Sequence, residues 1–105
     1  MNNIEKADIL REFIEHQIVN DRLYDALEQI EAIKYDYGNY MITAPINCDE
    51  ELQRVPTADY DLVCAIITML FREDHFSNGS LMERHRNGQV VPVLERLLKL
   101  LEQKL

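Results

Sequence analysis

The densest group of side chains that could do chemistry lies between residues 73 and 85. Glu73, Asp74, His75, Glu83 and His85 bring carboxylates and imidazoles into one short span, and these groups bind metals or transfer protons. The spacing does not favour a shared site, because residues two apart on a helix, such as Glu83 and His85, point in different directions. We expect these residues to form a structural corner between two helices. The alternative is a small metal-dependent enzyme that uses Glu73, Asp74 and His75.

The sequence shows no motif for nucleophilic catalysis or for phosphate binding. Cys48 and Cys64 have no motif of activating residues around them, and His16 stands alone on an amphipathic segment as a surface histidine. The three glycines are isolated, so the sequence has no phosphate-binding glycine loop. We therefore predict no catalytic residue, no cofactor and no metal, with both cysteines as thiols and Cys64 in the core.

Charge is unevenly distributed along the chain. Nineteen acidic and 11 basic residues give a net charge of −8. Residues 1–34 hold eight acids and four bases, residues 35–59 hold five acids and one base, and residues 60–105 hold six of each. A negative surface repels phosphates, which argues against direct binding to nucleic acid or to an anionic membrane. We expect instead a protein partner with a basic surface.

Two rows of carboxylates are expected along the first two helices, because acidic residues recur there at steps of three and four. The first row comprises Glu5, Asp8, Glu12 and Glu15, and the second comprises Asp21, Asp25, Glu28 and Glu31. Successive members would lie about 4.5 to 6 Å apart along the axis, close to the phosphate spacing of a nucleic-acid strand. The rows could mimic nucleic acid in a basic groove, or they could be solvated faces laced with Lys6, Arg11, Arg22 and Lys34.

The basic residues of the last third also have two interpretations. Arg84, His85 and Arg86, with Arg72 nearby, form the densest basic cluster and could hold an isolated anion. Arginines of this kind more often pair with carboxylates on a neighbouring helix, so we expect ion pairs here.

An acidic, tyrosine-containing segment without helical periodicity follows the second row. Tyrosine is enriched at protein interfaces because its ring combines a large apolar area with a polar tip. The alternative is that the tyrosines pack the segment onto the helices. Gly38-Asn39 could form the turn of a small hairpin, and Asp49 could cap a single helical turn within a long surface connection. The candidate partner-binding residues are Asp21, Asp25, Glu28, Tyr35, Asp36, Tyr37, Tyr40, Asp49, Glu50 and Glu51.

Apolar periodicity predicts helices on both sides of this segment. The spacing predicts one helix over 3–18 and a second over 21–33, capped by asparagine or aspartate and joined as an antiparallel pair. A third helix begins after Pro56, with Thr57 or Asp59 as its cap, and is apolar all round, so we expect it to be buried. It should pack against the apolar face of the last helix, which consists of Val93, Leu94, Leu97, Leu98, Leu101 and Leu105.

Between these two helices we expect a short fourth one. Ser77 or Asn78 would cap its start, and Asn87-Gly88 would end it through the left-handed conformation that glycine allows. Pro92 suits the first turn of the last helix. We therefore predict a single mainly α domain spanning residues 1–105, a compact bundle of about five helices with a long irregular loop or small hairpin after the second.

The location follows from what the sequence lacks. The longest apolar run, Leu62 to Phe71, is about half of the ~20 residues that span a bilayer. The first residues show no basic region followed by an apolar one, so no signal peptide is expected. We predict a cytoplasmic protein, in which disulfides are uncommon.

A resemblance supports the order of the last helices. The run from Arg72 through Phe76, followed by Gly79, Leu81, Gly88 and Leu94-Glu95-Arg96-Leu97, resembles the C-terminal pattern of an uncharacterised family of small, mostly helical bacterial proteins of unknown function. In that pattern an Arg-Glu-Arg-Phe-like connector precedes a glycine-started short helix and a closing Leu-x-Arg-Leu helix. His75 stands where the pattern usually has an arginine. The resemblance covers the C-terminal forty residues only.

Charge and composition together predict a non-enzymatic binding module or inhibitor. Its acidic, tyrosine-containing surface would act on a basic protein, possible targets being proteins that handle nucleic acid. One concrete form is a phage or mobile-element antagonist of a host defence complex. A structural homodimer, with a second copy covering an exposed apolar helix face, is a further alternative.

Overall fold

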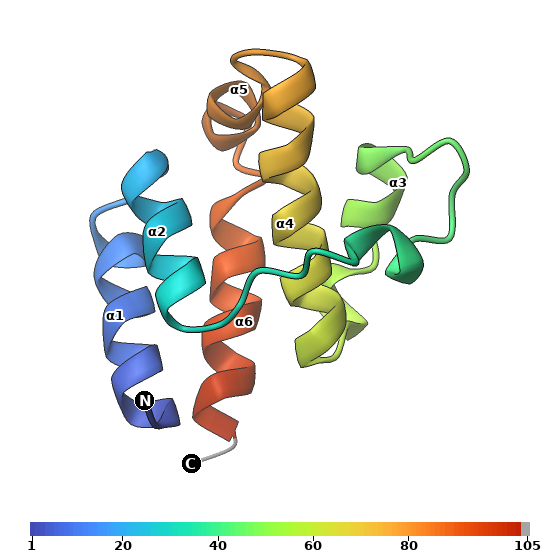
Figure 1. Ribbon diagram of the computed structural model, residues 1–105. Helices are drawn as coiled ribbons and strands as arrows, with labels where there is room; N and C mark the ends of the chain where they lie inside the picture. Colours follow the sequence, from blue (N-terminus) through green and yellow to red (C-terminus); the bar gives the residue numbers. More distant parts are fainter. Residues whose placement is uncertain (104–105) are drawn as a thin grey trace.

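The computed structural model describes residues 1–103 and is built from helices, with no β-strand among those residues (Figure 1). The elements are α1 (Asn3–Glu15), α2 (Asp21–Gln29), η1 (Tyr37–Tyr40), α3 (Cys48–Leu52), η2 (Val55–Thr57), α4 (Tyr60–Phe76), α5 (Ser80–Arg86) and α6 (Val91–Gln103), where η denotes a 3-10 helix. The predicted mainly α fold is confirmed. The segment after α2 contains short helical turns in place of a hairpin, and Leu105 lies outside the described residues.

Two helices form the centre of the molecule. Every residue of α4 from Val63 to Leu70 is buried, which matches its apolar character on all sides. Helix α6 lies between α1 and α4 and packs against both, while α5, α3 and η1 also pack against α4 (Figure 1). The sequence paired the last helix with α4 alone, whereas its apolar face also covers α1. Among residues 1–103, no helix has both the length and the apolar character needed to cross a membrane.

Thr68, the one hydroxyl inside the buried stretch of α4, fastens the segment that crosses from α2 to η1. Its hydroxyl donates to the Cys64 carbonyl at 2.8 Å and accepts the Lys34 amide at 2.9 Å. Both bonds satisfy polar groups that burial would otherwise leave unpaired. The tyrosine-containing segment is therefore tied to the core where it begins.

Three helices begin as their capping residues predict. Asn2, Asn20 and Asp59 each accept a hydrogen bond from an amide in the first turn, at 2.8, 2.9 and 2.9 Å. Pro92 is the second residue of α6, where a missing amide removes no helical hydrogen bond. These starts depend on neighbouring residues only, so the sequence was sufficient to locate them.

The corner between α4 and α5 is smaller than expected. Helix α4 continues through Phe76, so the run from Arg72 through Phe76 is helical. Neither Ser77 nor Asn78 caps α5; its N-cap is Gly79, with a left-handed φ of 94°. The Asp74 carboxylate instead accepts the amides of Gly79 and Leu81, both at 3.1 Å. A side chain from the previous helix thus replaces the local cap.

Helices α1, α2 and α5 end in the same way, although only α5 shows it in its sequence. The residue after the C-cap has a positive φ in each: 50° at Gln17, 62° at Glu31 and 74° at Gly88. The next amide then bonds to the carbonyl five residues earlier, at 2.9, 2.8 and 2.9 Å. This Schellman geometry usually uses glycine. The sequence therefore predicted the end of α5 correctly but placed the ends of α1 and α2 too late.

Candidate functional site

A cleft of ≈ 350 Å³ separates α2 from the C-terminal end of α4. The rings of Tyr24 and Phe71, which both line the cleft, meet edge-on with centroids 5.2 Å apart. Three carboxylates and one guanidinium surround these rings, so the lining is acidic and aromatic. Its residues, which define the α2–α4 cleft, are Asp21, Tyr24, Asp25, Phe71, Arg72, Asp74 and His75.

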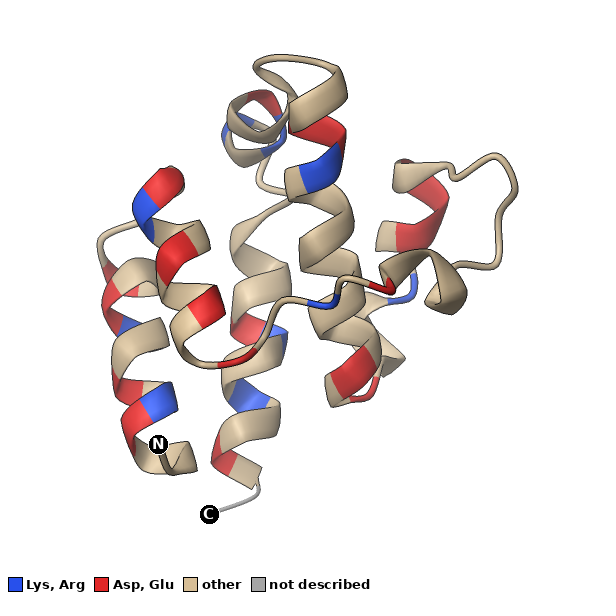
Figure 2. Cartoon of the chain, viewed as in Figure 1, with Lys and Arg blue, Asp and Glu red and all other residues tan. Residues whose placement is uncertain are grey.

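The acidic row on α2 is set by which face of the helix is buried. Leu23, Ala26 and Leu27 turn into the core, which leaves Asp21 and Asp25 exposed on the outer side. Figure 2 shows the acidic bands of α2. Within residues 1–103, neither of these two carboxylates forms a salt bridge or accepts a side-chain hydrogen bond. Their charge is available to another molecule.

The row on α2 is shorter than predicted at its C-terminal end. Glu31 lies beyond the last helical residue and adopts the left-handed conformation, so it leaves the line of carboxylates. Glu28 remains on the helix and accepts a hydrogen bond from the Tyr35 hydroxyl at 3.1 Å. That bond to a carboxylate raises the pKa of Tyr35. The tyrosine-containing segment and α2 therefore share one surface.

The basic residues expected to lace both rows are distributed unequally. Arg11 of α1 pairs with Asp8 at 2.7 Å and with Glu102 of α6 at 3.0 Å. Lys34 pairs with Asp61 at 3.3 Å, away from either row. The Arg22 guanidinium lies 5.9 Å from the centre of the Phe13 ring. Within residues 1–103 one acid of the α1 row, Asp8, is therefore paired with a basic residue, whereas none of the α2 acids forms a salt bridge.

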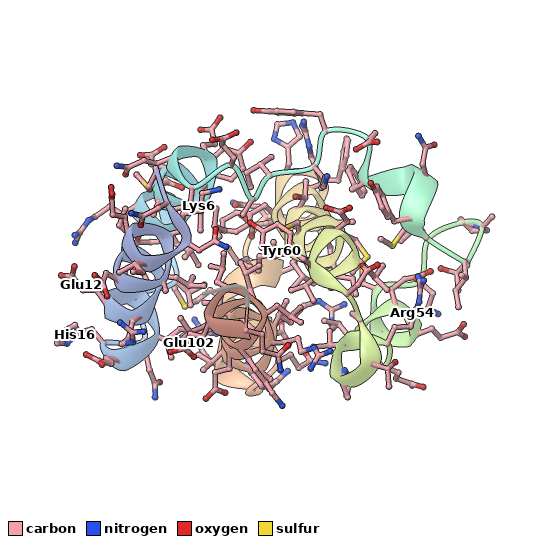
Figure 3. The ribbon with its side chains drawn as sticks, turned by 90° about the horizontal axis from the view of Figure 1, so that it is seen from below. Lys6, Glu12, His16, Arg54, Tyr60 and Glu102 are labelled. Carbon is pink, nitrogen blue, oxygen red and sulfur yellow. The ribbon has the colours of Figure 1, made fainter. Side chains whose placement is uncertain are left out.

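The outer side of α1 carries the exposed acids of the first row. Glu12 and His16 point away from the other helices there (Figure 3). His16 is exposed, as expected of a surface histidine.

The three tyrosines of the segment after α2 differ in exposure, so some fit the predicted partner surface and others the alternative of packing onto the helices. Tyr35 is 69% exposed, and Asp36 beside it is also exposed. Tyr37 and Tyr40 belong to η1, are half-buried, and lie where η1 packs on α4. The Lys34 ammonium lies 5.9 Å from the centre of the Tyr40 ring. Tyr35 and Asp36 are thus exposed to solvent, while Tyr37 and Tyr40 help to hold the segment down.

Glu51 must be removed from the predicted set of partner-binding residues, because its side chain is 0% exposed. It accepts the amides of Ile42 and Thr43 at 3.0 and 2.8 Å, the Thr43 hydroxyl, and the Arg54 guanidinium at 2.7 Å. Figure 3 shows Arg54 beside this segment. Burial alone would raise the pKa of Glu51, but the bonds from Thr43 and Arg54 outweigh it and lower the pKa. Glu51 organises the loop and cannot meet a partner.

Arg84 joins three helices through its guanidinium. It donates two hydrogen bonds to Glu73 of α4, at 2.6 and 2.8 Å, and one to Asp49 of α3 at 2.7 Å. Gln89 accepts a weaker bond at 3.3 Å. These contacts lower the pKa values of both carboxyl groups, chiefly through the hydrogen bonds from Arg84. The expected ion pairs are confirmed at Arg84. Asp49 is paired although its side chain is 72% exposed, and its neighbour Glu50 is also exposed.

The residues proposed for a metal enzyme have other roles. Glu73 is bound by Arg84, and Asp74 caps α5. The His75 ring meets the Phe76 ring edge-on at 5.3 Å. In residues 1–103 no group of three or more His, Cys, Asp or Glu side chains is arranged to hold a metal ion. The geometry therefore gives the metal-dependent alternative no support.

The cysteines lie in different surroundings, and neither is in a disulfide. Cys64 is buried in α4, as predicted. Cys48 is the first residue of α3, where it is half-buried. Burial first, and then the nearby Glu73 carboxylate, raise the pKa of Cys48 to about 11. A thiol with that pKa is almost wholly protonated at neutral pH and is a poor nucleophile.

Sequence reasoning missed the aromatic part of the surface. Tyr24 and Phe71 lie far apart in the chain and meet only because α2 packs near α4. Phe76, at the end of α4, is 83% exposed, although it continues an apolar helix. Its position beyond the buried stretch, beside charged residues, was the only local signal for that exposure. The acidic residues predicted on α2 were correct in kind but incomplete as a description of the site.

One comparison with known proteins assigns the chain to a family. The model of a family described as "Family of unknown function (DUF6508)" matches residues 2–103. The chain belongs to this family. The resemblance inferred from the C-terminal forty residues was therefore right in kind and too narrow in extent, since the DUF6508 match includes α1, α2 and the tyrosine-containing segment. Searches of curated proteins and of solved structures returned no match.

Proposed function

We propose that this DUF6508 protein is a non-catalytic binding module that docks its α2–α4 cleft onto a basic surface of a partner protein. The observation that carries the proposal is the pair Asp21 and Asp25, exposed and unpaired within residues 1–103, at the rim of a cleft with aromatic walls. Exposed carboxylates beside rings offer a partner's lysine or arginine both an ion pair and a cation–π contact.

The overall charge supports the same kind of partner. At −8 the protein attracts basic surfaces over distances of about a Debye length, which raises association rates at low salt. Asp21, Asp25 and Glu28 are spaced about 6 and about 4.5 Å apart along the axis of α2. That spacing approaches the phosphate spacing of a nucleic-acid strand. An inhibitor of a nucleic-acid-handling complex, such as an antagonist encoded by a phage or mobile element, is one form that this function takes.

The test compares two double charge reversals. Asp21→Lys with Asp25→Lys changes the cleft, and Glu5→Lys with Glu12→Lys makes the same change of net charge on α1, where both residues are exposed. Tagged wild-type and variant proteins are used to capture partners from the native cell. The captured protein is then purified, and its affinity is measured at about 50 and about 300 mM salt, with circular dichroism as a check of folding.

We expect the α2 variant to lose at least about tenfold in affinity and the α1 variant to lose much less, because close charge pairs contribute far more than distant ones. Wild-type binding should weaken as salt rises. Equal losses in both variants, or binding that does not change with salt, would contradict the proposal.

A further inference from the structure

A second hollow, of ≈ 230 Å³, lies on an adjoining side of α4. Tyr37 of η1, Ile46 and Cys48 form one wall, and Met69 and Phe76 of α4 form another. We call this the Phe76 hollow. Its lining is largely apolar, and its one carboxylate, Glu73, is already held by Arg84. The hollow therefore differs in chemistry from the acidic α2–α4 cleft.

Two of the apolar side chains that line this hollow are exposed. Phe76 is 83% exposed and Ile46 is 41% exposed, and Ile42, earlier in the same loop as Ile46, is 72% exposed. Ile42 and Ile46 are held at the surface by the loop that Glu51 organises, through the bonds from the Ile42 and Thr43 amides. Single exposed apolar residues are ordinary, but a group of them beside a hollow is typical of an interaction site.

Helical geometry makes the two depressions neighbours. Successive residues of α4 are turned by about 100°, so Phe71, Asp74 and His75 share one side. Met69, Glu73 and Phe76 share the adjoining side, and Arg72 lies between the two sets. Arg72 lines both depressions, which agrees with this arrangement. The exposed end of α4 is thus a ridge with an acidic depression on one side and an apolar one on the other.

We propose that this ridge recognises one linear segment of a partner protein through two side chains of different chemistry. A lysine or arginine enters the α2–α4 cleft and meets Asp21 and Asp25, and an aromatic or large aliphatic side chain fills the Phe76 hollow. The inference rests on the proposed function, because it describes how the same partner is read. It adds that charge alone is insufficient and that an apolar anchor is required.

Charge complementarity selects such a segment over a second copy of the chain. In a two-fold dimer through this ridge, the acidic face of each α2 would approach the other copy, and each copy carries a net charge of −8. Carboxylates brought together in this way repel one another. A basic segment gains attraction on the same surface. It also covers the apolar side chains that are otherwise exposed to water.

The experiment uses three pools of fluorescent peptides about eight residues long, enough to cross the ridge at about 3.3 Å per residue. The first pool combines lysine or arginine with one phenylalanine or leucine. The second replaces the apolar residue with serine, and the third replaces the basic residues with glutamate. Binding is followed by fluorescence anisotropy against the full-length protein, and the bound peptide is located by amide chemical shifts.

Three variants separate the contributions. Phe76→Ser removes the apolar wall, and Met82→Ser is its matched control, because Met82 is exposed but lines neither depression. Asp25→Lys reverses one charge in the cleft. Phe76 and Asp25 are both exposed, so these substitutions leave the core intact.

We expect only the basic and apolar pool to bind, with about tenfold weaker binding by Phe76→Ser, a similar loss for Asp25→Lys and no change for Met82→Ser. The shifted amides should include those near Phe76 and Asp25. If Phe76→Ser binds as tightly as wild type while Asp25→Lys does not, the apolar anchor is refuted and the proposed function stands. If both variants bind every pool like wild type, both proposals fail.

Two further results would overturn the inference alone. One is the absence of binding by any pool to the wild-type protein, since the occupant is then not a linear segment. The other is a dimer in light scattering that Phe76→Ser abolishes and Met82→Ser does not, because a second copy would then cover the Phe76 hollow.

Discussion

Carboxylates in two regions of this protein lie in opposite surroundings. Around α3, Glu51 is buried and Glu73 is 22% exposed, and each is held by an arginine of the same chain. On α2, Asp21 and Asp25 are exposed and have no arginine or lysine partner in residues 1–103. The formal charge is the same in both places, but the surroundings differ.

The difference shows which acids are available to another molecule. A carboxylate that leaves water must be compensated by donors and cations within the fold, so it is no longer free to attract a partner. A carboxylate that stays in water needs no such compensation and keeps its charge available. Glu51 therefore belongs to the interior, although it looked like part of the acidic surface in the sequence. Asp49 stays 72% exposed, but its charge is already paired with Arg84.

The largest effect that separates the two regions should come from Glu51→Gln. An amide nitrogen cannot accept the bonds that one carboxylate oxygen now accepts, so at least one buried donor near Thr43 or Arg54 loses its partner. We expect the free energy of unfolding to fall by about 3 kcal/mol, measured by urea denaturation. The control is the neighbouring exposed residue Glu50. Glu50→Gln should change the free energy of unfolding by less than about 0.5 kcal/mol. Equal effects would contradict the role given to Glu51.

Arg84→Met should be the next most damaging change. It removes both bonds to Glu73 and the bond to Asp49, and it leaves the Glu73 carboxylate partly buried without its cation. Since Glu73 retains some contact with water, we expect a loss of about 2 kcal/mol in the same measurement. Arg86→Met, at an exposed position on the same helix, is the matched control. A loss no larger than that of the control would refute the joining role of Arg84.

Acid should weaken the α3 region first. The pKa values of Glu51 and Glu73 are lower in the folded protein than their ordinary values, so the unfolded chain binds more protons. The stability that they contribute is therefore fully present at neutral pH and is lost as the pH falls below about 4. Urea midpoints across this range should fall less steeply for Glu51→Gln than for wild type. Parallel curves would show that Glu51 does not contribute in this way.

The smallest effect on folding is expected on α2. Asp25→Asn removes a charge that forms no salt bridge in the described chain, so the free energy of unfolding should change by less than about 0.5 kcal/mol. Binding to a basic partner should nevertheless weaken. A large loss of stability would place Asp25 with the interior carboxylates and remove the contrast between the two regions.

Much of the fold could be predicted from the sequence, but the candidate site could be predicted only in part. The apolar character of Val63 to Leu70 marked α4 as the buried helix, and Gly88 marked the end of α5. Gln17 and Glu31 end α1 and α2 with the same backbone geometry but without glycine, so both helices were predicted too long. The acids of α2 were predicted to be exposed, whereas the aromatic walls beside them and the Phe76 hollow were not predicted.

The sequence by itself determined the features that depend on one turn of chain: the caps at Asn2, Asn20 and Asp59, and the periodic burial of the helices. The tertiary structure alone decided which charged residues are paired with other residues of the same chain. Asp49 and Arg84 are 35 residues apart, and they meet because α3 and α5 both pack on α4. Local signals weaken beyond a turn, whereas desolvation and pairing depend on every helix packed around α4 and α6. For that reason the cleft at Asp25 emerged only from the packed molecule.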